Sequence, residues 1–253
     1  MTRLILYNIQ YCAGTRGNVG GYLQFWKMLF PPRYLDYVMA SELKKYNPDI
    51  VGLVEVDTGS IRAKKQNKVT FFKEMLDFEG HIERVKYIKK GFSGVFRRMP
   101  IIKKQANAIL SKQKADHVRY HSLTNGTKRV VIEAVFEKPK KVHVMLVHLA
   151  LGQKTRKKQL EQLILMVNSI KEPVILMGDF NIFKGLDEIK PLLDSTDLTY
   201  FMGKRKAYTQ PTIKPTKTLD LILTSDRIKV NNYEVLDLKF SDHLPVMIDF
   251  DVK

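Results

Sequence analysis

Two features are scarce in this chain of 253 residues: cysteine and long apolar runs. The single cysteine, Cys12, excludes an internal disulfide, so the sequence has no need of an oxidising compartment. We expect Cys12 to be a small buried residue behind a first strand. No apolar segment is long enough to cross a bilayer, and Met1 leads directly into Leu4-Ile5-Leu6-Tyr7 without a signal-peptide pattern. These absences predict a cytoplasmic protein.

Acidic side chains are also few relative to basic ones. The chain has 43 Lys and Arg against 26 Asp and Glu, which gives a net charge of +17 and a pI near 9.7. A surface of this kind attracts polyanions, either nucleic acid or anionic lipid headgroups. The hydrophobic fraction of 44% is ordinary for a globular protein, so the excess of positive charge is the compositional signal.

The order of patterns along the chain predicts one α/β domain over residues 1–253. Apolar residues at helical spacing predict helices at 34–46, 69–78 and 156–170. Short apolar runs between turn signals predict the strands. The expected strands are 3–9, 49–56, 81–88, 106–111, 130–136, 142–149, 174–177, 219–223, 233–238 and 246–250. The chain has no repeat or linker that would divide it into two domains.

Polar side chains recur at the ends of the expected strands. A polar cluster at the end of a buried strand lies at the rim of a sheet, where a substrate can reach it. Single Asp or His residues usually have structural explanations, but a set at several strand ends predicts a functional site. The set comprises Asn8, Glu55, His148, Asp179, Asn181, Asp220, Asp242 and His243.

These residue types suit metal-assisted attack of water on a phosphate ester. Glu55, with Asn8 and Asp242, offers the oxygen ligands that Mg²⁺ prefers. His243 offers a base whose charge changes near neutral pH, if a carboxylate fixes its tautomer. Asp220 lies within an apolar run, where its charge needs a partner, and is the candidate for that supporting role.

Seven short sequence strings, spread in order from the first expected strand to the last, resemble those of the endonuclease/exonuclease/phosphatase superfamily. The resemblance therefore extends over almost the whole chain. This superfamily includes pancreatic-type deoxyribonucleases, abasic-site nucleases, neutral sphingomyelinases and inositol-phosphate phosphatases. The resemblance implies an α/β fold, a four-layer sandwich with two packed mixed β-sheets flanked by helices. The strings are Tyr7-Asn8, Val54-Glu55-Val56, Ala106-Asn107-Ala108-Ile109-Leu110-Ser111, Val147-His148-Leu149, Gly178-Asp179-Phe180-Asn181, Leu219-Asp220-Leu221-Ile222 and Ser241-Asp242-His243-Leu244-Pro245.

The resemblance also implies roles at the site. It makes Glu55 the main metal ligand, helped by Asn8 and Asp242, with Mg²⁺ or Mn²⁺ as the ion. Asp179 would orient the attacking water or hold a second ion.

The remaining roles concern the phosphate and its proton transfers. By the same resemblance, Asn181 would bind the phosphate. His243 would contact the phosphate or act as the base, paired with Asp220. His148 matches a histidine that serves as general acid or phosphate ligand in the deoxyribonuclease and sphingomyelinase branches.

Three positions depart from the abasic-site nucleases. Those enzymes usually carry Trp-Asn at the first strand and Gln-Glu at the second, where this chain has Tyr7-Asn8 and Val54-Glu55. They also use a tyrosine where this chain offers His148. The sequence therefore disfavours a dedicated abasic-site repair enzyme.

Basic clusters favour a nucleic-acid substrate. Arg156 follows His148 in the next loop and is the candidate substrate-binding cation, while Lys103-Lys104 precedes a strand expected at the site. If several clusters share the face of the site, they form a track for a phosphate backbone. The other clusters are Lys64-Lys65, Lys89-Lys90, Arg97-Arg98, Lys138 with Lys140-Lys141, Lys157-Lys158 and Lys204-Arg205-Lys206.

Residues 22–32 favour a different substrate. This stretch places Phe25, Trp26, Leu29 and Phe30 between basic residues, which resembles a segment that contacts an anionic phospholipid surface. The same segment could equally stack bases or pack beneath the sheets. The alternatives to a nuclease are therefore a phospholipid or small-molecule phosphoesterase and, from another class, an inactive basic nucleic-acid-binding protein. The last is disfavoured because every expected polar position is occupied by a competent residue.

Overall fold

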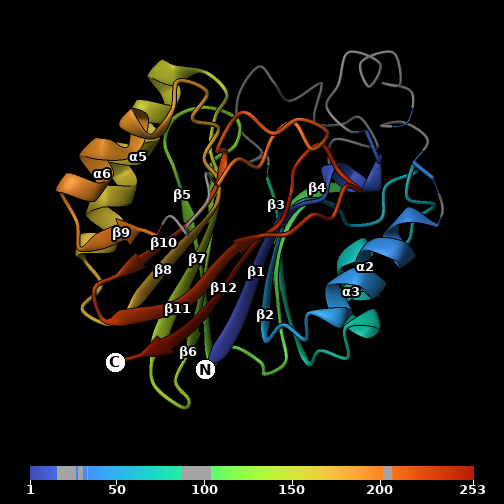
Figure 1. Ribbon diagram of the computed structural model, residues 1–253, viewed down its shortest axis with the longest axis horizontal. Coiled ribbons are helices and arrows are strands. Elements are labelled where there is room, and N and C mark those ends of the chain that lie inside the picture. Colours follow the sequence, from blue (N-terminus) through green and yellow to red (C-terminus); the bar gives the residue numbers. More distant parts are fainter. Residues whose placement is uncertain (16–26, 28–30, 33, 87–103, 202–206) are drawn as a thin grey trace.

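The computed structural model shows two six-stranded β-sheets packed face to face, with helices on the outer face of each (Figure 1). The structure describes residues 1–15, 27, 31–32, 34–86, 104–201 and 207–253. Both sheets are mixed, and the four layers agree with the fold expected from the sequence. Among the described residues, no helix is both long enough and apolar enough to span a membrane.

The first sheet contains both ends of the chain. Its strand order is β11-β12-β1-β2-β4-β3, in which only the β1–β2 pair is parallel. Its strands are β1 (Thr2–Asn8), β2 (Ile50–Asp57), β3 (Gly80–Val85), β4 (Gln105–Ser111), β11 (Ile228–Val235) and β12 (Val246–Val252).

The second sheet is built from the middle of the chain. Its order is β5-β6-β7-β8-β10-β9, in which only the β7–β8 pair is parallel. Its strands are β5 (His117–Ser122), β6 (Val130–Phe136), β7 (Val142–His148), β8 (Val174–Asp179), β9 (Leu198–Tyr200) and β10 (Asp220–Ser225).

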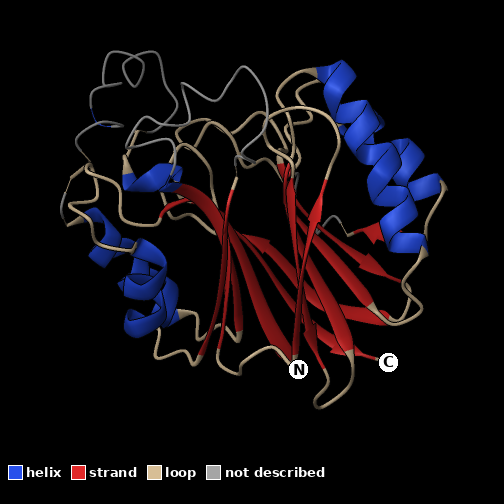
Figure 2. Cartoon of the chain, turned by 180° about the vertical axis from the view of Figure 1, so that it is seen from behind, coloured by secondary structure: helices blue, strands red, loops and turns tan. Residues whose placement is uncertain are grey.

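Helices cover the two outer faces, as Figure 2 shows from behind. Helices α2 (Leu35–Lys45) and α3 (Lys68–Met75) pack on the first sheet, and α5 (Gln153–Asn168) and α6 (Lys190–Asp194) pack on the second. Two short 3₁₀ helices, η1 (Gln10–Cys12) and η4 (Leu186–Ile189), complete the described elements.

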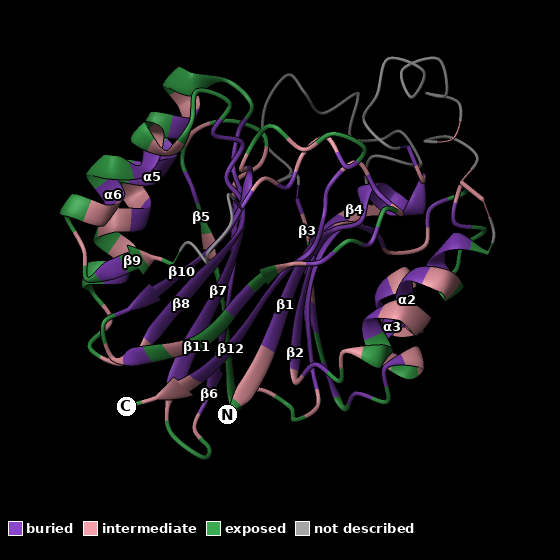
Figure 3. Cartoon of the chain, in the orientation of Figure 1, coloured by how far each residue is buried: buried purple, intermediate pink, exposed green. Residues whose placement is uncertain are grey.

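Three apolar cores hold these layers together, one between the sheets and one beneath each helical layer. In β1, Leu4 and Leu6 face the other sheet while Ile5 and Tyr7 face the helices. A strand buried on both faces needs a continuous apolar run, which is the pattern in the sequence. Figure 3 shows the result: the central strands are buried, while the edge strands β5 and β11 and the outer sides of the helices include exposed residues.

Each parallel pair is joined by a helical crossover and ends at the same edge of the molecule. Strands β1 and β2 are connected through α2, and β7 and β8 through α5. In Figure 1 the two chain termini lie at the opposite end from the loops that follow these strands. The residues after the two parallel pairs therefore meet across the sandwich, which is where open α/β folds bind ligands.

Sequence patterns located most elements, with several differences. Strand β11 spans Ile228–Val235 rather than 233–238, and β5 and β9 were not expected at all. Strand β5 has the polar sequence HVRYHS at the sheet edge, so apolar alternation does not mark it. Strand β9 has only three residues. Helix α3 begins near its expected start because Asn67 caps it by accepting a hydrogen bond from the Val69 N–H, and it ends at Met75 rather than at 78.

Cys12 is buried behind the first strand, as expected. Only 2% of its surface is exposed, and burial raises the pKa of the thiol to about 12. Because the thiolate is the reactive form, this cysteine is an inert core residue.

A buried carboxylate on the second sheet should make stability depend on pH. Glu133 accepts hydrogen bonds from His121 Nε2 at 2.5 Å, His143 Nδ1 at 2.7 Å and Arg119 at 3.0 Å. The bonds from the two histidines hold the pKa of Glu133 well below its usual value. A carboxyl with a depressed pKa stabilises the fold fully above the pKa of the unfolded chain, and this contribution is lost as pH falls.

We therefore expect Glu133→Gln to lower the free energy of unfolding at pH 7 by about 2 kcal/mol. The difference from the parent protein should shrink as the pH falls below about 4.5, the ordinary value for glutamate. Urea unfolding at pH 7, 5 and 3.5 measures it, with the exposed Glu74→Gln as the matched control. A difference that stays constant across this range would contradict the role of the Glu133 charge.

Candidate active site

Strand register places three of the expected site residues in one row. In the second sheet His148 is the register partner of Asp179, and Asp179 is the register partner of Asp220. They end β7, end β8 and begin β10, respectively, so one edge of the sheet presents an imidazole and two carboxylates. All three are at least 98% buried.

Gly178 permits this close row. Its φ is +154°, and a Cβ there would lie 2.0 Å from the carbonyl oxygen of Val147 on the neighbouring strand. No side chain fits at that distance, so only glycine lets β8 approach β7 directly beside Asp179. The glycine of the Gly-Asp-Phe-Asn string is therefore a packing requirement of the site.

In the first sheet, Glu55 lies on a β-bulge. The register between β2 and β4 shifts between Leu53 and Val56, and Glu55 has a φ of +59°. Its backbone N–H donates to Asn107 Oδ1 at 3.3 Å in place of a ladder bond. A bulge changes the direction in which a strand's side chains point, and bulges often lie beside functional sites. The sequence predicted that β2 would end near Glu55, but the strand resumes after the bulge and continues to Asp57.

Asn8 connects the two sheets. Its side-chain amide donates to Asp179 Oδ2 at 3.1 Å, and its carbonyl oxygen Oδ1 accepts from the Gln10 N–H at 3.2 Å. The backbone carbonyl of Asn8 accepts from Ser241 Oγ at 2.7 Å. This bond ties the Ser241-Asp242-His243 loop to the end of β1. Ser241 is fully buried, so the serine of this string is a structural anchor.

His243 and Asp220 form the expected pair. The imidazole Nδ1 lies 2.6 Å from Asp220 Oδ2, and both side chains are buried. The other ring nitrogen, Nε2, lies 3.5 Å from Gln210 Nε2. The second oxygen of Asp220, Oδ1, is buried without a hydrogen-bond partner among the described residues.

Asn181 is fixed by the turn that follows β8. It has a φ of +53°, its N–H donates to Asp179 Oδ1 at 3.0 Å, and its amide donates to the Leu149 carbonyl at 2.9 Å. Asp179 thus accepts from both Asn8 and Asn181, which holds its carboxylate in one orientation.

Two lysines that the sequence analysis missed enter the site. The ammonium of Lys86 lies 3.3 Å from Glu55 Oε1 and donates to the Tyr11 hydroxyl at 3.0 Å, and Lys86 is 1% exposed. Lys128 donates to Nε2 of His148. A lysine in a strand or turn carries no sequence signal of this kind, because both contacts arise between distant elements.

A buried glutamine holds the Lys128 turn in place. Gln159 of α5 donates to the carbonyl oxygens of Lys128 and Asn125, both at 2.8 Å, and accepts from the Ala150 N–H. Because α5 follows directly after His148, one side chain couples the lysine turn to the end of β7.

The pKa values of His243 and Asp179 are both raised above their ordinary values. Burial alone would lower the pKa of His243, but the carboxylates of Asp220 and Asp242 outweigh it and raise the pKa to about 10. Burial raises the pKa of Asp179 to about 6, and the charge of Asp220 adds to this rise. Titratable groups shifted in this way are typical of active sites.

The cations set the charge state of the other half of the site. Burial lowers the pKa of His148 well below its usual value, and the ammonium groups of Lys86 and Lys128 lower it further. His148 is therefore neutral. Burial would raise the pKa of Glu55, but Lys86, Lys128 and His243 outweigh it and lower the pKa. Glu55 is therefore ionised.

The donor set fits a divalent cation. Burial raises the pKa of Asp242, and the charge of Glu55 raises it further, so a cation bound to both carboxylates would relieve their repulsion. The side-chain oxygen Oδ1 of Asn8, a residue tied to the Ser241-Asp242-His243 loop, keeps one lone pair free. His148 Nδ1, buried without a hydrogen-bond partner among the described residues, lies 4.0 Å from Glu55 Oε1, but it is not a ligand atom, because it carries the ring proton when Lys128 donates to Nε2.

A second group could also hold an ion. One ligand atom from each of Asp179, Asp220 and His243 lies within 4.8 Å of the others. Within this group the Asp220 oxygen Oδ2 accepts from His243 Nδ1, and the two oxygens of Asp179 accept from Asn8 and Asn181.

Arg156, which the sequence predicted to bind substrate, is engaged within the protein. Its guanidinium is buried, donates to the carbonyl oxygens of Ala150 and Leu151 at 2.8 Å, and pairs with Glu188 at 2.5 Å. The basic residue after His148 therefore joins the loop before α5 to η4. Helical position explains the difference, because Arg156 lies on the buried face of α5.

We expect Arg156→Met to lower the free energy of unfolding by about 3 kcal/mol, because it leaves the Glu188 carboxylate buried without its partner. Affinity for nucleic acid should change less than about twofold, within the spread expected for a single uninvolved side chain. Chemical unfolding and a binding titration measure the two effects. Lys157→Met, an exposed neighbour on the same helix, is the control and should keep full stability. Weaker binding by a normally stable Arg156→Met would restore the substrate-binding role.

Several features of the sequence lie outside the described residues. These include the aromatic side chains Phe25, Trp26 and Phe30 with Leu29, and the basic clusters at 89–90, 97–98 and 204–206 together with Lys103. The membrane-contact interpretation of residues 22–32 therefore stays a prediction.

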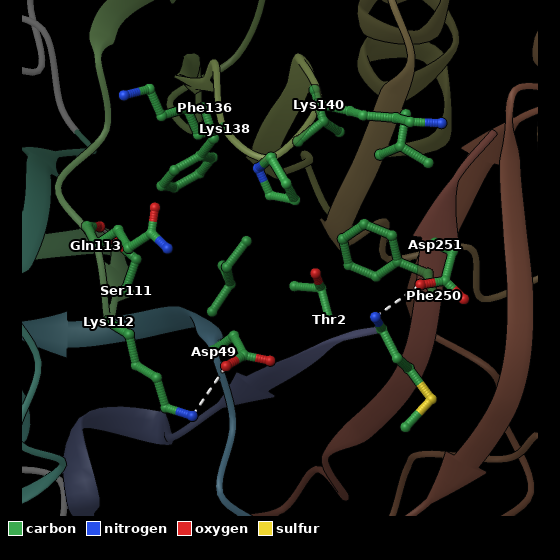
Figure 4. Close-up of a pocket in the computed structure, with 15 residues that line it drawn as sticks. Thr2, Asp49, Ser111, Lys112, Gln113, Phe136, Lys138, Lys140, Phe250 and Asp251 are labelled. Carbon is green, nitrogen blue, oxygen red and sulfur yellow. Dashed lines mark hydrogen bonds and ion pairs between the residues drawn. The ribbon is translucent and has the colours of Figure 1, made fainter.

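A cavity of about 520 Å³ opens at the other end of the sandwich (Figure 4). Its apolar lining includes Ile50, Phe136, Val142 and Phe250, which close the core between the sheets. It contains none of the expected site residues, because it lies where the parallel strands β1, β2 and β7 begin, at the opposite end from the polar residues on which these pairs end.

The chain belongs to the endonuclease/exonuclease/phosphatase family. Residues 38–243 match the model of the "Endonuclease/Exonuclease/phosphatase family", a range that runs from α2 to His243. Members of this family are generally phosphoesterases. The assignment confirms the resemblance that the seven strings carry.

Comparisons with individual proteins give the fold and leave the substrate open. The chain is 37% identical over 101 residues to the uncharacterized protein YbhP of Escherichia coli, a match that spans 33% of this chain and only 40% of YbhP. An endonuclease/exonuclease/phosphatase from Beutenbergia cavernae has a TM-score of 0.72 at 18% identity, covering 99% of this chain and 71% of that one. A mannosyl-6-phosphatase from Bacteroides thetaiotaomicron has a TM-score of 0.66 at 16% identity, covering 99% and 100%.

Proposed function

We propose that this protein is a divalent-metal-dependent phosphodiesterase whose substrate is nucleic acid. The buried His243–Asp220 pair carries the proposal, because it faces the Asp179 carboxylate within one site. A histidine fixed by a carboxylate beside a second, separately oriented carboxylate is the arrangement that hydrolysis of a phosphate ester requires.

In the proposed reaction, water attacks phosphorus while the bond from phosphorus to the leaving sugar oxygen breaks. Asp179, oriented by Asn8 and Asn181, accepts the proton of the attacking water. The imidazolium of His243, supported by Asp220, donates through Nε2 to an equatorial phosphate oxygen and stabilises its growing charge. Of the two roles expected for His243, the raised pKa therefore favours phosphate contact over that of a base.

The neutral imidazole of His148 suits phosphate binding better than proton donation. Lys128 donates to its Nε2, so its proton resides on Nδ1, which has no other partner among the described residues. That N–H is available to a phosphate oxygen. Asn181, expected to bind phosphate, remains the second polar contact on the same sheet edge.

Glu55 and Asp242, with Asn8 Oδ1, are the residues that would hold Mg²⁺ or Mn²⁺. When bound, the ion would neutralise phosphate oxygens and stabilise the leaving oxygen. Lys86 lies against Glu55 and holds the carboxylate ionised, which keeps it ready to bind a cation.

Nucleic acid is the favoured substrate because of the net charge of +17. A polyanion gains affinity from many lysine contacts, whereas a small phosphoester uses only those at the site. This interpretation predicts that activity falls steeply as salt rises.

A hydrolysis panel tests the proposal: single- and double-stranded DNA, RNA, sphingomyelin and phosphoinositides, each with Mg²⁺ and with EDTA. Metal-dependent cleavage of nucleic acid that His243→Ala loses is the expected result. Cleavage of lipid alone would replace nucleic acid with a phospholipid and assign residues 22–32 to membrane contact.

A small phosphoester is the second candidate. It is supported by the fold shared with a mannosyl-6-phosphatase and by the two site lysines, Lys86 and Lys128, which suit a compact dianion. Turnover of a sugar phosphate with no cleavage of any nucleic acid would favour this candidate.

A further inference from the structure

An aromatic ring stands exposed immediately beyond the proposed phosphate-binding residue. After Asn181 the chain buries Ile182 in the core beneath the helices and then turns outward, which leaves Phe183 40% exposed. The Phe183 N–H donates to the Asn181 carbonyl at 2.9 Å, so the ring is held by the same turn that fixes Asn181. Its position is therefore set by the site rather than by a loose surface loop.

The segment between β9 and β10, in the same sheet as β8, reaches the same place. Gln210 and Lys217 form a β-bridge, and Lys217 donates its N–H to the Gln210 carbonyl at 2.9 Å. From this bridge the Gln210 side chain extends to His243, and the Lys217 ammonium lies 5.0 Å from the centre of the Phe183 ring. The Gln210–Lys217 bridge thus positions two side chains: Gln210 contacts His243, and the Lys217 ammonium lies near the Phe183 ring.

We propose that Phe183 and Lys217 form a subsite for an unpaired nucleobase next to the scissile phosphate. The inference rests on the proposed function and specifies its substrate as single-stranded or locally opened nucleic acid. A flat ring offers every base a stacking surface, and a neighbouring lysine can pair with the phosphate of the same nucleotide.

The distance between Asn181 and Phe183 suits the phosphate and the base of one nucleotide. Phe183 is two residues from Asn181, so their Cα atoms are at most about 7 Å apart. One sugar separates a base from its phosphate, which is a distance on the same scale. A phosphate at Asn181 therefore places its own base, or the base beside it, over Phe183.

The chemistry of the subsite also sets its specificity. Phe183 has no hydrogen-bonding group, so stacking there does not distinguish one base from another. Within the described part of the chain, the exposed Lys217 ammonium is paired with no carboxylate and is free to move to a backbone phosphate. The subsite should favour unpaired strands without a strong sequence preference.

Binding to two matched probes tests this inference. All measurements use the His243→Ala background with Mg²⁺, because this variant binds without turnover. The probes are a fluorescent single-stranded DNA 12-mer and the same strand with abasic sites throughout. Adding Phe183→Ala should weaken binding of the normal strand by about 10- to 100-fold, the range for loss of one stacked base, and leave the abasic strand unchanged. Phe183→Trp should retain binding, because a larger flat ring can also stack.

Matched controls come from the same segment. Ile213→Ala removes an apolar side chain that is 48% exposed, and Lys214→Ala removes an exposed lysine. Ile213→Ala should leave binding of both probes unchanged. Lys217→Ala should reduce the slope of log affinity against log salt by about one, as loss of one phosphate contact does, and by more than Lys214→Ala.

Two results would overturn the inference. Equal loss on the normal and the abasic strand would mean that Phe183 does not contact bases, and unchanged binding by Phe183→Ala would mean that it contacts nothing. Failure of the proposed function is distinguishable, because the parent protein would then cut neither strand, whether or not it binds them.

Discussion

We expect His243→Ala to lower kcat for phosphodiester hydrolysis by about 10³-fold, within the range for removing a group that stabilises developing charge or transfers a proton. The imidazolium lies between Asp220 and the space before Asp179, and alanine leaves nothing to contact the phosphate oxygens there. Affinity for nucleic acid should change little, because many surface lysines supply it. Steady-state kinetics together with a binding titration separate the two effects.

The matched control is His117→Ala, because His117 is an exposed histidine on an edge strand. Its activity should equal that of the parent protein. The activity of Asp220→Asn should fall between those of His243→Ala and His117→Ala. Asparagine keeps the shape of the His243 partner but removes the charge that supports the imidazolium. If His243→Ala retained more than about a tenth of parent activity, the proposed role of His243 would be wrong, since general acid–base and charge-stabilising groups contribute at least about 10²-fold.

Much of the fold followed from local pattern because each central strand is buried on both faces. Strands β1, β2, β7 and β8 are largely apolar runs. Strands β1, β7 and β8 end on Asn8, His148 and Asp179, and β2 carries Glu55 near its end. Parallel pairing then brings those ends to one edge, so proximity of the polar residues could be predicted before the register was known.

What local pattern missed depends on contacts between distant segments. The bulge at Glu55 is visible only once β2 is paired with β4. Lys86 and Lys128 enter the site through contacts with Glu55 and His148 that no spacing encodes. Arg156 is the opposite case. Its positive charge suggested that it binds substrate, but it lies on the buried face of α5 and contacts the protein interior.

We expect Glu55→Gln to raise the Mg²⁺ concentration needed for half-maximal activation by at least about tenfold, since even residues that only support metal ligands change metal affinity by about 10- to 100-fold. Glutamine keeps the size of the side chain and its place on the bulge, so the change removes charge and little else. The Lys86 ammonium would then lie next to a neutral amide and would repel an incoming cation.

Metal binding should be measured directly as well as through activity. Titration of Mn²⁺ followed by electron paramagnetic resonance reports affinity without turnover, and the exposed Glu74→Gln serves as the matched control. Unchanged Mn²⁺ affinity in Glu55→Gln would remove Glu55 from the ligand set and shift attention to the Asp179, Asp220 and His243 group.

A double-mutant cycle then decides whether Glu55 and Asp242 hold the same ion. The charge of Glu55 raises the pKa of Asp242, so each carboxylate lies within the electrostatic range of the other. If one ion lies between them, the losses of Mn²⁺ affinity in Glu55→Gln and Asp242→Asn should not add, because the second substitution acts on a site that the first has already weakened. Additive losses would mean that the two carboxylates bind separate ions, and the site would then work with two metals.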